Sequence, residues 1–164
     1  MTLVRKSLLL LSVAFAAIAL PASADNHGKP NIVAVASGNA DFSTLVTAIK
    51  AADLVDALSA AGPYTVFAPT NAAFQAIAST VAGLTIPQLT TVLTYHVLGS
   101  EVLAANIPFG TPVATLAGQN ITINAGTPPT ITDTTTTAAA IVATDVRASN
   151  GVIHVIGKVL IPVL

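Results

Sequence analysis

Apolar residues recur at helical spacing through the first half of the chain. Asp41 stands directly before one such stretch, and we expect it to cap a helix there. A second short helix continues the pattern and is closed by Gly62-Pro63. A third helix begins around Pro87, a residue that favours a first turn, and runs up to Tyr95. The apolar face of the first helix comprises Phe42, Leu45, Val46 and Ile49.

The stretch that begins at Tyr64 carries signals for a strand, a stop and a helix in close succession. Its first five residues are apolar and β-prone, which predicts a short buried strand. Pro69 has no amide to donate to a ladder and is expected to end that strand. Thr70 and Asn71 are residue types that cap helices, so a helix is expected over Ala72–Ile77.

From His96 onward the apolar spacing changes from helical to alternating, which is typical of strands. Asn150-Gly151 lies between two extended runs and predicts a type I′ hairpin turn, since both central residues of that turn need positive φ. Because helices come first and strands later, the predicted fold class is α+β. The predicted strands are Val113–Thr115, Asn120–Asn124, Thr130–Thr132, Ile141–Ala143, Gly151–Ile156 and Val159–Ile161.

The first 24 residues have the organisation of a secretory signal peptide. Arg5 and Lys6 supply a positive start, an apolar core follows, and small residues before the junction predict cleavage following Ala24. The protein is therefore expected to be secreted or periplasmic, with no membrane span in the mature chain. We interpret residues 25–40 as a leader and residues 41–164 as the folded domain. Within the leader, Asn31–Ala36 is either the start of a helix or an irregular lead-in, and the sequence leaves this choice open.

Cleavage following Ala24 would place Asp25-Asn26-His27 at the new N-terminus. A free amino group, two amides and a histidine in third place can surround Cu(II) or Ni(II) in a square-planar nitrogen site. The alternative is that His27 stands in a loose leader by chance, and the sequence leaves this choice open.

Charge and composition narrow the possible functions. Without Arg5 and Lys6, four bases remain against seven acids, which argues against nucleic-acid binding. The chain has no cysteine, so disulfides and thiolate metal sites are excluded. His27, His96 and His154 are far apart in the sequence, so no metal site is expected within the domain. No nucleophile elbow or phosphate-binding loop occurs, and we expect neither enzyme activity nor a cofactor.

Three segments carry a dense mixture of these signals: Thr65–Phe74, Tyr95-His96 and Asn150–Ile156. In this order and spacing they resemble the opening, middle and closing signatures of the fasciclin domain family. The resemblance covers Asp41 to Leu164. It implies a compact β-sandwich with several short helices packed along one side. The positions of the structural signature are Thr65, Phe67, Pro69, Thr70, Asn71, Phe74, Asn150, Gly151 and His154.

The resemblance also suggests binding residues. In some animal members of the family the Tyr-His segment is implicated in integrin binding, so the candidates here are Tyr95, His96, Val97 and Leu98. The Asp-Ile pair that the family carries in the preceding loop is missing from residues 81–86, which argues against an animal-type receptor activity. The residues themselves offer an alternative, in which His96 is buried at a helix end and bonded to the backbone.

Other polar positions are open to more than one interpretation. His154, within an alternating strand, is expected to be either a solvated residue or an inter-strand hydrogen bonder. Asn71 is expected to cap a helix rather than contact a partner. The segment Gly126–Ala140 departs most from the family pattern, and it is either a wandering edge strand and loop or a recognition lip.

Two functions from different classes fit these observations. The first is an exported interaction module that mediates adhesion to a cell-surface or matrix protein or polysaccharide. The second is a carrier of an apolar small molecule such as a carotenoid, because some fasciclin-like proteins bind carotenoids and only 8% of the residues are charged. The identity of the partner and the oligomeric state do not follow from the sequence.

Overall fold

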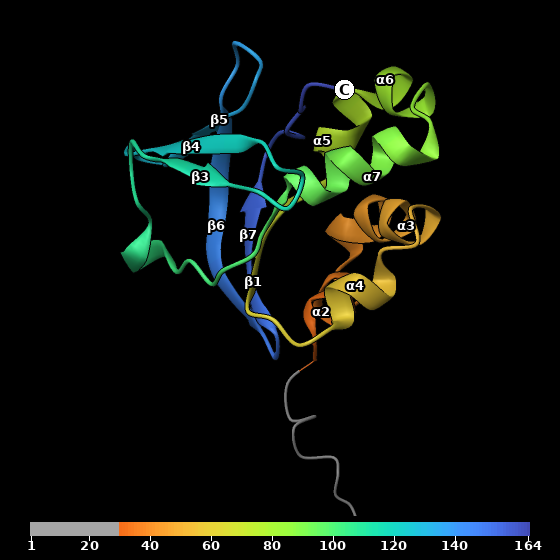
Figure 1. Cartoon of the computed structure of the whole chain (residues 1–164), viewed down its shortest axis with the longest axis horizontal. Helices are drawn as coiled ribbons and strands as arrows, with labels where there is room; N and C mark the ends of the chain where they lie inside the picture. Colours follow the sequence, from red (N-terminus) through yellow and green to blue (C-terminus); the bar gives the residue numbers. More distant parts are fainter. Residues whose placement is uncertain (1–29) are drawn as a thin grey trace, which may run out of the picture.

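The computed structural model describes residues 30–164, which form a strongly curled β-sheet with helices along one side (Figure 1). The fold class is therefore α+β, as predicted. The predicted signal peptide, its cleavage point following Ala24 and the Asp25-Asn26-His27 segment all lie outside the described residues.

Short helices form where an apolar face meets a capping residue. Helix α7 is an example: Thr85 and Gln88 cap each other's backbone reciprocally, and Pro87 stands in the first turn as predicted. Helices α2 to α7 lie on the same side of the sheet (Figure 1). The helices are α2 (Ile32–Ser37), the 3₁₀ turn η4 (Ala40–Phe42), α3 (Ser43–Ala51), α4 (Val55–Ser59), α5 (Asn71–Ala76), α6 (Ala78–Ala82), α7 (Ile86–Tyr95) and the 3₁₀ turn η5 (Ala104–Asn106).

Seven strands form one sheet in the order β2-β1-β7-β6-β5-β4-β3. Strands β1 and β7 are parallel, and the other neighbours are antiparallel. The two ends of the sheet meet, because Leu98 pairs with Thr115 and the Leu116 amide donates to the Val97 carbonyl at 2.8 Å. The sheet is thus almost a barrel, with the face-to-face packing of a compact sandwich. The strands are β1 (Tyr64–Pro69), β2 (Val97–Leu98), β3 (Pro112–Ala114), β4 (Asn120–Asn124), β5 (Thr130–Thr132), β6 (Ala139–Ala148) and β7 (Gly151–Ile156).

Two apolar clusters lie on opposite faces of the central strands β1 and β7. Val66 and Ile153 belong to the cluster between the sheet and the helices. Phe67 is one residue after Val66 and Ile156 is three after Ile153, so both point to the other face and belong to the cluster inside the curl of the sheet. Because both faces are buried, these strands are apolar on both sides, as a parallel central pair requires.

The predicted caps Asp41 and Asn71 do not cap the helices that were expected to follow them. The Asn39 side chain accepts from the Asp41 amide at 2.9 Å, so Asn39 caps the first turn and Asp41 lies within it. Thr70, whose backbone is still extended, caps α5 by accepting from Ala73 at 3.4 Å. The prediction that Asn71 caps this helix is therefore wrong, since Asn71 is already its first residue.

The prediction of a last strand over Val159–Ile161 is wrong. The backbone amides in this segment bond to side chains instead of a neighbouring strand. The Leu160 amide donates to Nε2 of His96 at 2.9 Å, and the Ile161 amide donates to Oδ2 of Asp133 at 2.9 Å. The segment is apolar because it is buried, and its periodicity alone could not distinguish this from a ladder.

Strand β6 is longer than the predicted Ile141–Ala143, since it runs from Ala139 to Ala148. Its register with β7 shifts between Ala143 and Val146, and such bulges interrupt the alternation that reveals a strand in a sequence. Strand β2 was not predicted, because two residues are too short for any periodic pattern.

The predicted hairpin between β6 and β7 is present, but its turn is of another type. Ala148 pairs with Gly151, so Ser149 and Asn150 are the turn residues, and neither has the positive φ of a type I′ turn. Gly151 is required for a different reason. A Cβ atom at this position would lie 2.0 Å from the Tyr64 carbonyl oxygen in β1.

The segment 25–40, predicted as a leader, contains a helix that packs into the core. Ile32 and Ala36 of α2 are 1% and 2% exposed and belong to the cluster between helices and sheet. Asn31 caps this helix by accepting from the Ala34 amide at 2.8 Å. We propose that the folded unit begins before Asp41, at the start of α2.

Candidate functional site

The four candidate binding residues, Tyr95 to Leu98, lie at the end of α7 and in β2. None of their side chains is more than 2% exposed. Their assignment to partner binding stays a prediction, and in this structure their contacts are with the protein's own interior. A partner at the surface would not contact these four side chains, which could affect binding only by holding the surface residues in position.

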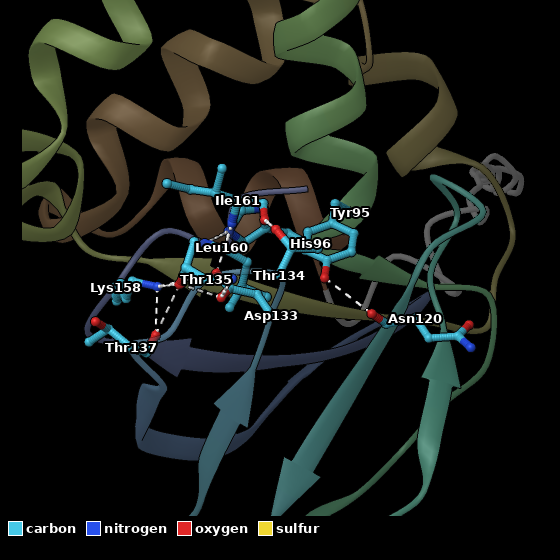
Figure 2. A network of polar contacts seen from close by, with 10 residues as sticks. All are labelled: Tyr95, His96, Asn120, Asp133, Thr134, Thr135, Thr137, Lys158, Leu160 and Ile161. Carbon is cyan, nitrogen blue, oxygen red and sulfur yellow. Dashed lines mark hydrogen bonds and ion pairs between the residues drawn. The ribbon is translucent and has the colours of Figure 1, made fainter. Parts of the chain in front are cut away.

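Tyr95 points into the curl of the sheet, and its hydroxyl donates to the Asn120 carbonyl at 3.1 Å (Figure 2). Burial, and to a smaller extent the Asp133 carboxylate, raises the pKa of the Tyr95 phenol above its usual value. The phenol therefore stays protonated and continues to donate this bond, which links α7 to β4.

His96 is buried with both ring nitrogens bonded to the backbone, as the structural alternative predicted. Nδ1 lies 2.7 Å from the Val92 carbonyl, and Nε2 accepts from the Leu160 amide at 2.9 Å. These partners require a neutral ring with its proton on Nδ1. Burial lowers the pKa of His96 to about 4, and the opposing effects of the Val92 carbonyl and Asp133 are smaller.

Asp133 lies beside this segment, and its carboxylate accepts from four groups of three residues (Figure 2). Oδ1 accepts from the amide and hydroxyl of Thr135, and Oδ2 accepts from the Ile161 amide and from Lys158 at 3.2 Å. Burial by itself raises the pKa of Asp133. The hydrogen bonds from Thr135, Ile161 and Lys158 outweigh it and hold the pKa below its ordinary value.

The ammonium group of Lys158 has a partner for each of its three donors. It bonds to Asp133, to the Thr135 hydroxyl at 2.6 Å and to the Thr137 carbonyl at 2.7 Å (Figure 2). These contacts fasten part of the threonine-rich segment Gly126–Ala140 against the chain that follows β7. That segment contains β5 and the start of β6, and its proposed role as a recognition lip stays a prediction.

His154 is fully buried in β7, so the alternative of a solvated residue is wrong. Its Nδ1 accepts from the Asp145 amide in β6 at 3.3 Å, and its Nε2 donates to the Val102 carbonyl at 2.7 Å. Its ring also lies 5.7 Å from that of Phe67. It is an inter-strand hydrogen bonder that also holds the segment after β2.

The remaining signature residues also act through structure. Thr65 is buried and bonds to the segment after β2 through its hydroxyl, and Phe74 fills the cluster under the helices. Asn71 joins two helices: its Oδ1 accepts from the Thr44 amide at 3.0 Å, and its Nδ2 donates to the Ala40 carbonyl at 2.8 Å. Asn71 thus caps α3, which has no side-chain cap of its own.

Two hollows open on the surface. One, of about 340 Å³, lies between the loop before β1, Glu101 and the β6–β7 turn. The other, of about 240 Å³, is apolar and lies between α3, α5 and α6, with Phe74 and Val81 among its walls. Within residues 30–164, no group of three acidic, histidine or cysteine side chains is placed to hold a metal ion.

Sequence reasoning missed Asp133 and Lys158, which organise the polar network. A signal was available, because Asp133 is the one acid between Glu101 and Asp145 and interrupts a run of threonines. A lone acid in such a place suggests a specific partner. Nothing in the local pattern identifies that partner as a lysine 25 residues later.

A fasciclin domain model matches residues 40–162 of the chain. The chain belongs to the fasciclin domain family. Fasciclin relatives include protein sll1483 of Synechocystis, 47% identical over 149 residues, which span 88% of this chain and 80% of that protein. Another is cell surface glycolipoprotein MPB83 of Mycobacterium bovis, 33% identical over 150 residues, or 87% of this chain and 65% of that protein.

The fold agrees with this family. A FAS1 domain pair from the insect cell adhesion molecule fasciclin I superposes with a TM-score of 0.62 at 18% identity, covering 75% of this chain and 46% of that one. At this identity the likeness shows a shared fasciclin fold. In the described part of the chain, no helix is long and apolar enough to cross a membrane.

Proposed function

We propose that this protein is an exported fasciclin module that mediates adhesion to a cell-surface or matrix component. Membership of the fasciclin family carries the proposal, since fasciclin domains are adhesion-type interaction modules. The likeness of this chain to a cell surface glycolipoprotein and to an insect cell adhesion molecule supports it. The predicted signal peptide supports export, and sequencing the N-terminus of the protein from its native source would test cleavage following Ala24.

The structure supports a module that binds with a preformed surface. The polar groups of the Tyr-His segment, Asp133 and Lys158 are bonded to one another or to the backbone, so they rigidify the domain. A rigid surface loses little conformational entropy when a partner binds. The partner therefore contacts exposed residues of the domain, and the buried Tyr-His segment acts by holding the surrounding surface in place.

Adhesion can be tested with purified protein coated on an inert surface. Cells of the native source should attach more strongly to this coating than to one of heat-unfolded protein, and soluble folded protein should compete. If folded protein neither retains cells nor binds isolated wall protein or polysaccharide, the adhesion proposal is wrong.

The apolar hollow between α3, α5 and α6 favours a second candidate, a carrier of an apolar small molecule. Its volume of about 240 Å³ is below the range typical of enclosed ligand sites, roughly 300–1,000 Å³. A polyene would therefore lie partly on the surface. Visible absorption by protein purified from the native source, lost on solvent extraction, would support a carotenoid carrier. Colourless protein whose solvent extract contains no apolar small molecule by mass spectrometry would contradict the carrier.

A further inference from the structure

The hollow beside the β6–β7 turn has the size and charge of a site for one side chain. Three segments line it: residues 61–63 before β1, Glu101, and residues 148–151 of the turn. Its volume of about 340 Å³ lies within the range of sites that hold small ligands. Glu101 is the one charged residue among those that line it.

The side of the hollow formed by the turn is fixed in place. The Asn150 side chain donates to the carbonyls of Leu58 and Ala60 at 2.7 and 2.8 Å and accepts from the Ile32 amide at 2.9 Å. The backbones of Gly62 and Asn150 are also in close contact, since a Cβ atom on Gly62 would lie 2.1 Å from the Asn150 carbonyl oxygen. The hollow therefore exists before any ligand arrives.

Glu101 is held from both sides. The Thr65 hydroxyl donates to the Ser100 carbonyl at 2.7 Å and accepts from the Val102 amide at 2.8 Å, so one buried side chain fixes both neighbours of Glu101. The Glu101 side chain is itself exposed, and it makes no ion pair or hydrogen bond with any other described residue. A carboxylate is thus presented on a rigid backbone without a partner of its own.

The surrounding charge favours a cation. Residues 30–164 contain three bases and six acids, and one of the bases, Lys158, is paired with Asp133. Arg147 precedes Ala148 in β6, but it occupies the opposite face of the strand and does not line the hollow. Glu101 is thus the one charge within the hollow, and the acids exceed the bases around it, which favours positively charged groups.

We propose that this hollow receives an arginine side chain projecting from a protein partner. A guanidinium group pairs with a carboxylate through two parallel hydrogen bonds and is weakly hydrated, so it leaves water more readily than an ammonium group. Its aliphatic stem would cover Ala61, Pro63 and Ala148. The inference rests on the proposed adhesion function, and it specifies that the partner is a protein with an exposed arginine.

The site can be tested with a single amino acid, because it is preformed. N-acetyl-arginine amide is titrated into ¹⁵N-labelled mature protein, and N-acetyl-citrulline amide serves as its neutral isostere. Arginine should shift the amide signals of Gly62, Ser149, Asn150 and Gly151 with a dissociation constant in roughly the millimolar range, and citrulline should not.

Two variants decide whether Glu101 is responsible. Glu101→Gln keeps the shape of the side chain and should abolish the shifts. Asp41→Asn removes an exposed charge elsewhere and should preserve them. Shifts that persist in Glu101→Gln, or that citrulline reproduces, overturn the proposal, as does the absence of any shift with arginine.

The outcome is separable from that of the adhesion proposal. If arginine binds through Glu101 but Glu101→Gln adheres as well as the wild type, the hollow is not the adhesion surface and the proposal is wrong in that respect. If the protein adheres but arginine does not bind, adhesion stands and this site is rejected. Loss of adhesion in Glu101→Gln, with Asp41→Asn unaffected, supports both.

Discussion

His96 keeps its place only as a neutral ring. One nitrogen donates to Val92, and the other accepts from the Leu160 amide. A second proton on the ring would point at the Leu160 amide hydrogen, so protonation removes a hydrogen bond and leaves a buried charge. The attachment of the C-terminal segment to His96 therefore depends on the pH.

This coupling predicts acid lability. The pKa of His96 is about 4 in the folded protein, against an ordinary value near 6.5. The contribution of His96 is fully present above pH 6.5 and is lost as the pH falls toward 4, because the unfolded chain binds the proton first. The unfolding free energy should fall by about 3 kcal/mol across this window.

Urea unfolding at several pH values measures this effect. His96→Gln, which cannot titrate there, should be less stable at neutral pH but should show a flatter pH profile. Equal slopes for the two proteins would show that His96 is not the group responsible. The lowered pKa of Asp133 extends the loss to more acidic pH, because that carboxylate must also be protonated.

Gly151 provides a second test at the residue scale. Gly151→Ala should lower the unfolding free energy by about 1–3 kcal/mol, since the new Cβ atom would overlap the Tyr64 carbonyl and push β7 from β1. Gly157→Ala is a matched control, because its Cβ atom would meet only ordinary contacts near 4 Å. Thermal denaturation of both variants measures the difference, and similar melting temperatures would contradict the close approach.

At the scale of elements, Asn71 makes the start of one helix depend on the start of another. Helix α3 begins without a side-chain cap in its own sequence, and the amide of Asn71, the first residue of α5, supplies one. The same amide group bonds to Ala40 in the preceding turn. The orientation of α5 behind β1 is therefore linked to the packing of α3.

Asn71→Ala should destabilise the protein by about 1–2 kcal/mol, because the Thr44 amide and the Ala40 carbonyl both lose their partner. Asn71→Asp retains the acceptor for Thr44 and places a negative charge at a helix start, so it should recover part of the loss. Chemical denaturation orders the three proteins. An aspartate variant no more stable than the alanine variant would contradict the capping role.

At the scale of the whole molecule, side chains take the place of a strand along the C-terminal segment. His96, Asp133 and Gln119 accept from the amides of Leu160, Ile161 and Val163 respectively. These three side chains come from the end of α7, the loop after β5 and the turn before β4. The segment therefore adds contacts between the end of α7 and the loops that flank β4 and β5, beyond those that the sheet makes.

This arrangement predicts that Asp133 matters more than its salt-bridge partner. Asp133→Ala should cost about 3 kcal/mol, because Ile161, Thr135 and Lys158 all lose the same acceptor. Lys158→Met should cost less, since the carboxylate keeps its other donors. Amide hydrogen exchange at Ile161 should accelerate in Asp133→Ala alone, and equal acceleration in both variants would contradict this order.

Much of the fold follows from local signals in the sequence. Periodicity and capping residues were sufficient for β1, α7, β4 and β5, whose predicted and observed bounds nearly agree. The C-terminal segment was misassigned, because its amides bond to distant side chains that no local pattern reveals. Asn71 was recognised as a capping residue, but the helix that it caps lies 27 residues away.

The candidate sites were harder to predict than the fold. The Tyr-His segment is visible in the sequence, and burial of His96 was one of its two interpretations, but the choice between burial and partner contact needed the tertiary structure. The hollow at Glu101 is formed by residues from three separate parts of the chain. Gly62 and Gly151 in its wall are needed because the backbones of distant segments approach closely there. Sites of this kind depend on tertiary packing, which sequence spacing does not encode directly.

The meeting of the two ends of the sheet has a consequence for the behaviour of the protein at high concentration. An open sheet offers a row of unpaired amides onto which a neighbouring chain can add a strand, and this is a common route to fibrils. Here Leu98 is already paired with Thr115, and Leu116 is bonded to Val97. These contacts occupy backbone groups at both ends of the sheet, so neighbouring copies of the domain have fewer free groups there to which they could add a strand.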